Sequence, residues 1–512
     1  MKSDSRLIAI LEIGSTGIRL LVAEIFEAGE WLVLDRADKS VALGRDVFIS
    51  GRISRESFLE CLAVLKNFQE LLRGWEIAPR DVHVIATSAL RIARNRDVFV
   101  DRVLRETGYL LNVVEGIEEN RLMYLAVRYA LKNDLPQFWR ANSMIVEVGG
   151  GSTEIMLLRR GKMVAAHSLN LGTIFIDQQS RVVMGSTRFQ ERFLNENVRN
   201  TSEFLSSEMD LAHVRTFVVA GSDVRFAAEE TGAVFNPNCR IISRDAFISF
   251  AERVKNCSAD ELVRNHRIPF ADAEGFSLGI MVYRLFLERT AAAQVIVPSI
   301  SIREGLLIDL TRGVEAALQE EFFSQVIASA VNLGRKFHYD ETHNRHVADL
   351  CMAIFDALVY EHGLLRRERM MLEVAAILHD VGMFIQSSDH HKHGRYIVAN
   401  SEIFGLHRDE LNIIANVISY HRGPPPDPSD IDYIALQREE RILVLKMASI
   451  LRVADALDRG HSQHIKNITV EKKGEILVLH SPGNYDFSLE HRGLEEKADM
   501  FQDVFGYKVV LT

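Results

Sequence analysis

The chain has 512 residues, of which 47% are hydrophobic and 25% charged, and its net charge is −10. This length predicts roughly three to five domains of ~100–200 residues each. The negative net charge excludes a global basic field that would draw the chain to nucleic acid or to an anionic membrane. No stretch reaches the ~20 apolar residues that span a bilayer, and the four cysteines have neither metal-ligand nor redox spacing. We therefore expect a cytoplasmic protein with free thiols.

Strands and helices alternate over the first 130 residues. The pattern predicts strands at residues 7–13, 18–25, 82–90 and 109–116, and helices at residues 54–75, 96–108 and 118–132. Ser54 is a good helix N-cap, and Gly108 is typical of a helix C-terminus. Such alternation predicts α/β layers.

The strand pattern then restarts near residue 143. The stretch "ILEIGSTGIRLLV" (10–22) aligns with "MIVEVGGGSTEIMLL" (144–158), so that Glu12 matches Glu147 and Gly14 matches Gly149. Each copy is an apolar strand that ends in Glu, then a glycine turn and a second apolar strand. This internal repeat predicts two copies of one subdomain that face each other across a cleft. The segment "AGSD" (220–223) supplies a third turn in the second copy.

The turns combine glycine with hydroxyl-bearing residues. Glycine lets backbone amides approach an anion, and Ser and Thr add hydroxyl donors. A tight hairpin that needs positive φ is the alternative for a single loop, whereas matched loops favour phosphate binding. Arg91 is a candidate phosphate clamp, because its planar fork suits phosphate oxygens. The other predicted phosphate-binding residues are Gly14, Ser15, Thr16, Gly149, Gly150, Gly151, Ser152, Gly221 and Ser222.

Carboxylates flank the turns. Glu12 and Glu147 end the strands that precede two turns, and Glu154 begins the strand after the second. Since phosphoryl cleavage needs charge neutralisation, we expect these three residues to hold a divalent ion, Mg²⁺ or Mn²⁺, or its waters. Glu118 and Glu119 begin a helix. They are candidates for the same chemistry, and the alternative is that they only stabilise the helix dipole.

From about residue 305 the sequence becomes mainly helical. Apolar residues recur at helical spacing in residues 322–337, 343–360, 366–384, 408–421 and 439–460. The last fifty residues read as strand, helix and strand. The pattern predicts four domains: residues 1–122, 123–305, 306–464 and 465–512.

These motifs together resemble the exopolyphosphatase/guanosine pentaphosphate phosphohydrolase (Ppx/GppA) family, within the actin-like ATPase fold group. The segments that carry the resemblance are "GSTGIRLLV", "ATSALRIARN", "EGIEENRLMYLAV", "VGGGSTEI", "LGT" (171–173), "AGSDVRFAA" and "SIREGLLIDL". The resemblance implies an α/β fold of two actin-like (ribonuclease H-like) subdomains with the active cleft between them. It also implies Glu119 as catalytic base, phosphate binding by the glycine loops and Arg91, a metal-holding Glu154, and a homodimer.

The chain departs from the family pattern at the strand ends. Family members usually have Asp where this chain has Glu12 and Glu147, and one extra methylene moves each carboxylate about 1.5 Å further into the cleft. This change fits a coordinated shift of the metal position, and it also fits lost catalysis with retained anion binding. In the third turn, Asp223 adds an acidic residue facing the cleft.

The helical half resembles the HD phosphohydrolase pattern, in the segments "THNRHVADL", "AAILHDVGMF", "HHKHGRYIV", "ISYHRG" and "LRVADALDR". A ligand set of His343, His379, Asp380 and Asp455 is predicted, and His393 and His421 extend it toward a two-metal site. Imidazole and carboxylate ligands suit a transition metal. The resemblance implies an all-α HD-type domain, followed by a small α+β C-terminal cap.

The predicted function is release of terminal phosphate from polyphosphate, or of the 5′-phosphate of guanosine pentaphosphate, by water that Glu119 activates. In the alternative, the HD-type domain hydrolyses a nucleotide phosphate and the actin-like pair senses guanosine tetraphosphate, pentaphosphate or polyphosphate. A non-enzymatic binding protein for these polyanions is a third possibility. Nucleic acid and membranes are not expected partners.

Overall fold

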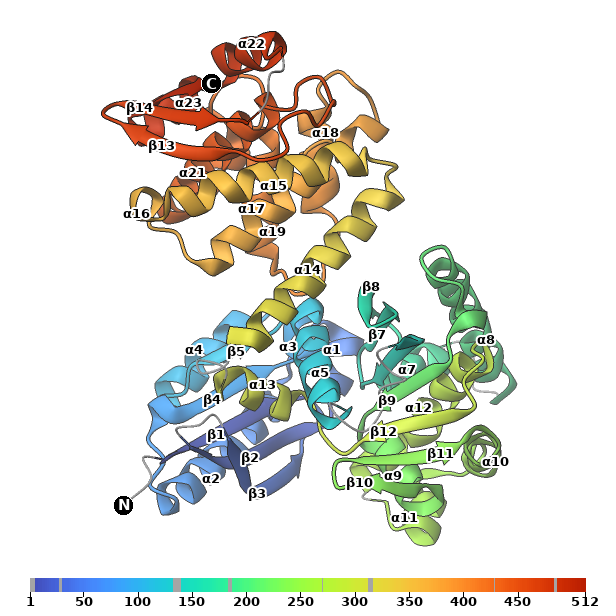
Figure 1. Ribbon diagram of the computed structural model, residues 1–512. Helices are drawn as coiled ribbons and strands as arrows, with labels where there is room; N and C mark the ends of the chain where they lie inside the picture. Colours follow the sequence, from blue (N-terminus) through green and yellow to red (C-terminus); the bar gives the residue numbers. More distant parts are fainter. Residues whose placement is uncertain are drawn as a thin grey trace. The chain divides into compact units, whose positions relative to one another are not determined.

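The computed structural model describes residues 5–26, 30–131, 140–182, 187–268, 270–311, 316–427, 429–482 and 486–512. The chain divides into two units, Met1–Glu321 and Phe322–Thr512. The long helix α14 (Ala316–Lys336) runs across the boundary between them (Figure 1).

The first sheet of the first unit has five strands in the spatial order β3-β2-β1-β4-β5. In chain order these strands are β1 (Ser5–Ile13), β2 (Gly17–Phe26), β3 (Trp31–Ser40), β4 (Val82–Ala86) and β5 (Leu111–Val113). The helices of this region are α1 (Leu43–Ser50), α2 (Arg55–Gly74), α3 (Ser88–Ile92), α4 (Arg96–Thr107) and α5 (Gly116–Leu131). As the sequence indicates, the Ser54 hydroxyl caps α2, and Gly108 follows α4 with a φ of 73°.

The second sheet has seven strands in the order β10-β11-β12-β9-β6-β7-β8. They are β6 (Asn142–Val148), β7 (Thr153–Arg159), β8 (Lys162–Leu169), β9 (Thr216–Ala220), β10 (Ala233–Asn236), β11 (Cys239–Ser243) and β12 (Gln294–Pro298). The helices in this part of the chain are α7 (Thr173–Val182), α8 (Thr187–Ser206), α9 (Ser222–Thr231), α10 (Arg244–Val254), α11 (Ala259–His266) and α12 (Phe270–Glu288), and α13 (Ile302–Thr311) follows the last strand.

The two sheets repeat one topology. In the first sheet, β1 pairs antiparallel with β2 and parallel with β4; in the second, β6 pairs antiparallel with β7 and parallel with β9. The order β3-β2-β1-β4-β5 therefore matches β8-β7-β6-β9-β12, and β10 and β11 extend the second sheet. The predicted internal repeat is confirmed at the level of strand order.

Helix α13 returns to the first sheet although it follows the second in sequence. It packs against α5 and β1, and Leu307 joins the core of Ile8, Ile10 and Leu21 (Figure 1). Two predicted domain boundaries, at 122/123 and 305/306, consequently fall inside α5 and α13.

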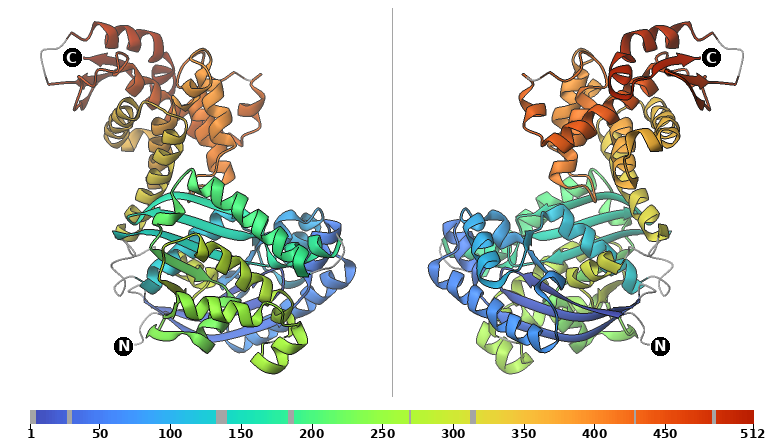
Figure 2. Two further views of the ribbon diagram at one scale, coloured as in Figure 1. Left: turned by 90° about the vertical axis from the view of Figure 1, so that its right-hand side faces the viewer. Right: turned by 90° about the vertical axis from the view of Figure 1, so that its left-hand side faces the viewer.

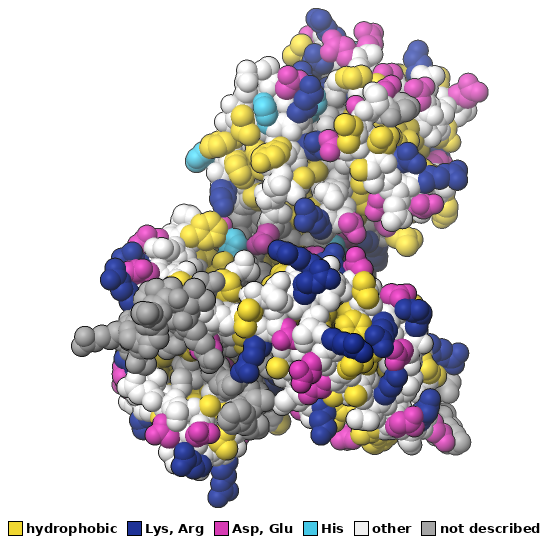
Figure 3. All heavy atoms as spheres, turned by 180° about the vertical axis from the view of Figure 1, so that it is seen from behind, with side chains coloured by type: hydrophobic (Ala, Val, Ile, Leu, Met, Phe, Trp, Pro, Cys, Tyr) yellow, Lys and Arg dark blue, Asp and Glu magenta, His cyan; other side chains and the backbone are white. Residues whose placement is uncertain are grey.

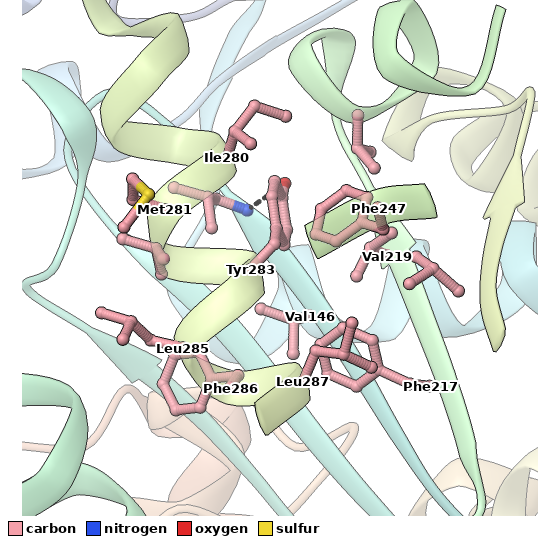
Figure 4. Packing of buried hydrophobic residues seen from close by; sticks show 14 of the residues in the cluster. Val146, Phe217, Val219, Phe247, Ile280, Met281, Tyr283, Leu285, Phe286 and Leu287 are labelled. Atoms are coloured by element: carbon pink, nitrogen blue, oxygen red, sulfur yellow. Dashed lines mark hydrogen bonds between the residues drawn. The ribbon is translucent and has the colours of Figure 1, made fainter. Parts of the chain in front are cut away.

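A buried tyrosine fixes the ends of two central strands of the second sheet. The Tyr283 hydroxyl accepts a hydrogen bond from the Val148 amide at 2.8 Å and donates one to the Ala220 carbonyl. Figure 4 shows the ring among Ile280, Phe247 and Val219, within the apolar core of this half. Because Val148 and Ala220 immediately precede two glycine turns, this anchor sets where both turns begin.

The second unit is mainly helical, as the sequence predicts, and ends in a small mixed layer (Figure 2). Its helices after α14 are α15 (Glu341–Ala357), α16 (Val359–His362), α17 (Arg366–Leu378), α18 (His390–Ala399), α19 (Arg408–Ser419), α20 (Ile431–Ile434) and α21 (Arg438–Ala456). The final layer combines β13 (Thr469–Lys473), β14 (Ile476–His480) and β15 (Lys508–Leu511) with α22 (Ser488–Lys497) and α23 (Asp499–Phe505). These last elements form the expected α+β cap.

The surface mixes both signs of charge. Lys and Arg side chains alternate with Asp and Glu over the face that Figure 3 shows. Among the described residues, no helix is both long enough and apolar enough to cross a membrane.

Candidate active site

The glycine turns of both halves of the first unit meet at one cavity of about 430 Å³. Gly14 from the β1–β2 turn, Gly149 from the β6–β7 turn and Gly221 after β9 all line it. The predicted convergence of the two copies on one cleft is therefore confirmed.

The two hairpin turns are closed in the same way. The Gly14 amide donates to the Gly17 carbonyl at 2.9 Å, and the Gly149 amide donates to the Ser152 carbonyl at 2.8 Å. These two amides are thus used within their turns. Ser15, Thr16, Gly150, Ser152, Gly221 and Ser222 also line the cavity.

Close packing forces glycine at three places around the site. A Cβ at Gly172 would lie 2.3 Å from the Gly151 carbonyl carbon, and one at Gly151 would lie 2.2 Å from the Phe48 ring. Gly151 is therefore closely packed and is not among the residues that line the cavity, and its predicted phosphate contact stays a prediction. Gly221 has a φ of 134°, which favours glycine, and a Cβ there would meet the Tyr283 hydroxyl at 2.8 Å.

Three carboxylates gather on one side of the cavity. Glu119 comes from the first turn of α5, Glu147 from the end of β6 and Glu154 from the start of β7. Burial, together with the negative charges of Glu119 and Glu12, raises the pKa of Glu147 to about 8. Burial and the Glu119 charge raise the pKa of Glu154 well above its usual value. Burial also raises the pKa of Glu119, although Arg91 opposes this shift.

Neutral donors hold Glu154 in place. The Ser168 hydroxyl donates to one carboxylate oxygen at 2.8 Å, and the Asn120 amide donates to the other at 3.2 Å. Glu154 is only 3% exposed. Neutral donors orient Glu154 without cancelling its negative charge, and the nearby carboxylates are also negative. Glu154 therefore still attracts a cation.

Glu12 has different surroundings from its repeat counterpart. Its two oxygens lie 3.4 Å from the Arg19 guanidinium and 3.2 Å from the Arg303 guanidinium. The predicted metal ligand Glu12 is therefore an ion-paired residue that orients two arginines at the cavity wall.

Arg225 is a cavity residue that we did not select from the sequence. It lies one turn into α9, lines the cavity, and has no side-chain hydrogen bond to any residue in the described ranges. Burial and the neighbouring Arg303 and Arg19 lower its pKa. Its position in "AGSDVR", directly after the third glycine turn, is the signal that identifies it.

Arg91 lies against Glu119 instead of lining the cavity. Its guanidinium donates to the Glu119 carboxylate and, at 2.9 Å, to the Val114 carbonyl. Helix α3 directs the side chain to the start of α5, and the role of Arg91 as a phosphate clamp stays a prediction. The adjacent Glu118 forms a bidentate pair with Arg121, which also binds Asp309 of α13. Of the "EE" pair, only Glu119 therefore faces the cavity.

In the second unit, the predicted residues His343, His379, Asp380 and Asp455 come together. His421 lies next to them, as predicted. His393 is not part of this group, and His390 takes its place.

The first unit is a duplicated two-lobed fold, because its two α/β halves share one strand order. The cavity that they enclose is lined by acidic, arginine and hydroxyl side chains, which suit a phosphorylated ligand. The pattern of the Ppx/GppA phosphatase family matches residues 21–312, and that of Ppx/GppA phosphatase domain III matches residues 327–499. The chain belongs to the Ppx/GppA phosphatase family.

Individual relatives agree with this assignment. The chain is 25% identical, over 472 residues, to a guanosine-5′-triphosphate,3′-diphosphate pyrophosphatase of Pseudoalteromonas atlantica, covering 87% of this chain and 86% of that protein. The crystal structure of the Ppx/GppA family member from Aquifex aeolicus has a TM-score of 0.50 at 24% identity and covers 61% of this chain and 100% of that one. An exopolyphosphatase from Cytophaga hutchinsonii has a TM-score of 0.54 at 19% identity and covers 60% of this chain and 99% of that one. These two structures support the fold.

Proposed function

We propose that the cavity of the first unit hydrolyses a terminal phosphoanhydride, in polyphosphate or at the 5′ end of guanosine pentaphosphate. The observation that carries this proposal is Glu119, 7% exposed, with its carboxylate in a cavity that Glu147 and Glu154 also line. A cavity with paired carboxylates for water and cation, and arginines for an anion, suits phosphoryl transfer to water.

The arginine side of the cavity binds the phosphate chain. Arg225 and Arg303 present guanidinium groups to the cavity, and Ser15 and Thr16, which carry hydroxyl groups, also line it. Guanidinium groups suit phosphate oxygens because they donate two parallel hydrogen bonds. These residues hold the terminal phosphate with its bridging bond accessible to a water molecule.

The acidic side fits a divalent cation such as Mg²⁺ or Mn²⁺. Buried carboxylates with raised pKa values favour either a proton or a cation, and oxygen ligands suit these ions. Glu147 and Glu154 would hold the ion, which supplies neutralisation of phosphate charge when bound. Glu12 is not part of this set, since two arginines already neutralise it.

Glu119 accepts the proton of the attacking water. The water oxygen bonds to the terminal phosphorus, the bridging P–O bond breaks, and the shortened chain leaves with the bond electrons. A carboxylate whose pKa burial raises is a better proton acceptor near neutral pH than an exposed one. Arg91 holds this carboxylate in position.

The two candidate substrates differ in whether a nucleoside is present. Ile49, Ile174 and Ile302 line the cavity, and Ile49 is 69% exposed. An exposed apolar side chain suits a nucleobase better than an inorganic chain, and the Pseudoalteromonas relative is named for a guanosine substrate. We therefore favour guanosine pentaphosphate over polyphosphate. The cytoplasmic location and the homodimer remain predictions.

The decisive experiment compares two neighbouring variants. Glu119→Gln keeps the shape of the side chain and removes the base, so phosphate release from both substrates should fall roughly 10²–10⁴-fold, while ligand binding persists. Glu118→Gln is the matched control: it weakens the pair with Arg121 and should retain turnover within a few-fold. Unchanged release by Glu119→Gln, in the presence of Mg²⁺ or Mn²⁺, would show that Glu119 is not the base.

A further inference from the structure

The first unit holds a second pocket, of about 520 Å³, next to the proposed catalytic cavity. Strand β3 of the first half and α9, β11 and β12 of the second half all contribute residues to it (Figure 1). Like the cavity, this pocket therefore has walls from both halves of the duplicated fold. No step of the proposed hydrolysis uses it, so its ligand follows from its own side chains.

The second pocket and the cavity share part of their lining. Ser222, Asp223 and Arg225, at the start of α9, line both spaces, and so does Arg303 of α13. A ligand in the cavity that extends past these residues therefore enters the second pocket. The two spaces can hold two ends of one molecule.

Two arginines of the second pocket have no partner for their charge. Arg225 and Arg240 of β11 make no side-chain hydrogen bond or ion pair within the part of the chain that the structure describes. Both residues are partly buried. Burial and the positive charges of Arg303 and Arg19 lower the pKa of Arg225, so an anion beside this guanidinium would relieve the repulsion.

The other two arginines that line the second pocket are already paired. Arg36 of β3 forms an ion pair with the buried Glu304, and Arg303 forms one with Glu12 at 3.2 Å. The unpaired positive charge therefore lies at Arg225, which also lines the cavity, and at Arg240, which lines only the second pocket.

The three carboxylates among the lining residues do not cancel this charge. Asp38 pairs with Arg19 at 3.2 Å. The Asp223 carboxylate lies against α12, where a Cβ at Gly279 would meet its Oδ2 at 2.4 Å. Glu229 is exposed, and water screens its charge. The second pocket therefore favours an anion over a cation.

Apolar side chains form the rest of the second pocket. Phe226 of α9 packs edge to face on the buried Phe276, with ring centroids 5.6 Å apart, and Ile268 also lines the pocket. Val297 is the cross-strand neighbour of Arg240, so the two side chains lie on the same face of the sheet. A linear chain of phosphates needs no apolar contact, whereas a phosphorylated sugar uses both kinds of surface.

We propose that the second pocket binds the diphosphate group that a doubly phosphorylated nucleoside keeps, which is the 3′-diphosphate of guanosine pentaphosphate. Arg240 and Arg225 bind its oxygens, and the apolar side chains contact the attached ribose. The assignment rests on the proposed function, because the 5′ phosphates then occupy the cavity. Arg240 would select the branched nucleotide over linear polyphosphate and over a nucleotide with a single phosphate chain.

The test compares two nucleotides that differ only in the 3′ group, guanosine tetraphosphate and GDP. Their affinities for the full-length protein are measured by calorimetry with Mg²⁺ present. Wild type should bind guanosine tetraphosphate more tightly than GDP. Arg240→Ala should weaken the binding of guanosine tetraphosphate roughly 10-fold or more, as expected when a charged hydrogen-bond donor is removed. The preference over GDP should shrink by the same factor, because GDP does not reach Arg240.

Arg289→Ala is the matched control, because Arg289 is an exposed arginine that lines neither the cavity nor the second pocket. Both affinities of this variant should equal those of wild type. Arg240→Lys keeps the charge without the planar fork, so its preference should lie between those of wild type and Arg240→Ala. Where Arg240→Ala fails to fold, Arg240→Gln replaces it.

Equal affinity of wild type and Arg240→Ala for guanosine tetraphosphate overturns the proposed subsite. A wild type that binds the two nucleotides equally, or an Arg240→Ala variant that loses both equally, overturns it too. Binding needs no turnover, so the proposed function is scored separately. A wild type that releases no phosphate, yet prefers guanosine tetraphosphate through Arg240, contradicts the hydrolysis alone.

Discussion

The two hairpins that begin the halves of the first unit have the same backbone and opposite chemistry. In β1–β2, Glu12 pairs across the strands with Arg19; in β6–β7, Glu147 pairs at the same place with Glu154. The cross-strand pair of the first copy therefore has no net charge, and its Arg19 lines the cavity. The second gathers negative charge and presents carboxylates.

This difference explains how a duplicated fold gains an asymmetric site. A phosphoanhydride needs cationic groups around its oxygens and a cation-holding, proton-accepting group beside the attacking water. One register position, occupied by Arg19 in one copy and by Glu154 in the other, supplies the cavity with a group of each kind. The following predictions test whether the two walls have these separate roles.

The largest expected effect is at Glu154. Glu154→Gln keeps the hydrogen bond from Ser168 but removes the charge, so a higher divalent-ion concentration should be needed for half-maximal activity. The increase should exceed roughly 10–100-fold, which is the usual loss of metal affinity when a group that only orients a metal ligand is removed. Ser168→Ala, which removes only the orienting donor, should show a smaller rise. Phosphate release measured against Mg²⁺ and Mn²⁺ concentration reports both; equal metal dependence of Glu154→Gln and wild type contradicts the acidic-wall role.

An intermediate effect is expected on the arginine wall. Arg225→Ala removes a charged hydrogen-bond donor worth about 1.5–3 kcal/mol, which corresponds to roughly 10–150-fold in kcat/KM. Its metal dependence should stay as in wild type. Arg253→Ala, an exposed arginine paired with Glu230, is the control and should be unaffected. A changed metal requirement in Arg225→Ala, with kcat/KM intact, would reverse the roles of the walls.

The smallest expected effect on turnover accompanies a change in stability. The pKa of Glu147 is raised from its usual 4.5 to about 8 in the folded state. Between these values the folded protein keeps a proton that the unfolded chain releases, so metal-free stability falls as pH rises through this window and levels off above about 8. The loss is at most a few kcal/mol, at about 1.4 kcal/mol per pKa unit.

Urea unfolding with a chelator at pH 5, 7 and 9 measures this dependence. Glu147→Gln should flatten it, and adding a divalent ion to wild type should reverse it. An identical pH profile for Glu147→Gln and wild type would show that Glu147 is ionised throughout.

Some site residues were predictable because their signal is local. Gly14, Gly149 and the strand-end glutamates follow from a repeated strand–turn–strand pattern that any reader of the sequence can align. The position of His379–Asp380 at the end of an apolar helix is equally local. These features depend on neighbours within a few residues, and local periodicity records them.

Other residues depend on partners that are distant in the sequence. Arg91 was predicted to bind phosphate, but α5 places Glu119 where its guanidinium ends. Glu12 was predicted to hold a metal, but Arg303, nearly 300 residues later, lies beside it. Among the histidines of "HHKH", the start of α18 at His390 determines which one faces Asp380, and the letters do not distinguish them.

The sequence alone was sufficient for the duplicated α/β half, the helical second half and the α+β cap, because burial periodicity and turn residues act over short range. Only the folded chain decided which arginines reach the cavity, which glutamates pair with arginine and which histidine lies beside Asp380. Those outcomes are charge pairings and close packing between segments far apart in sequence, and pair energies of this kind are set by three-dimensional distance.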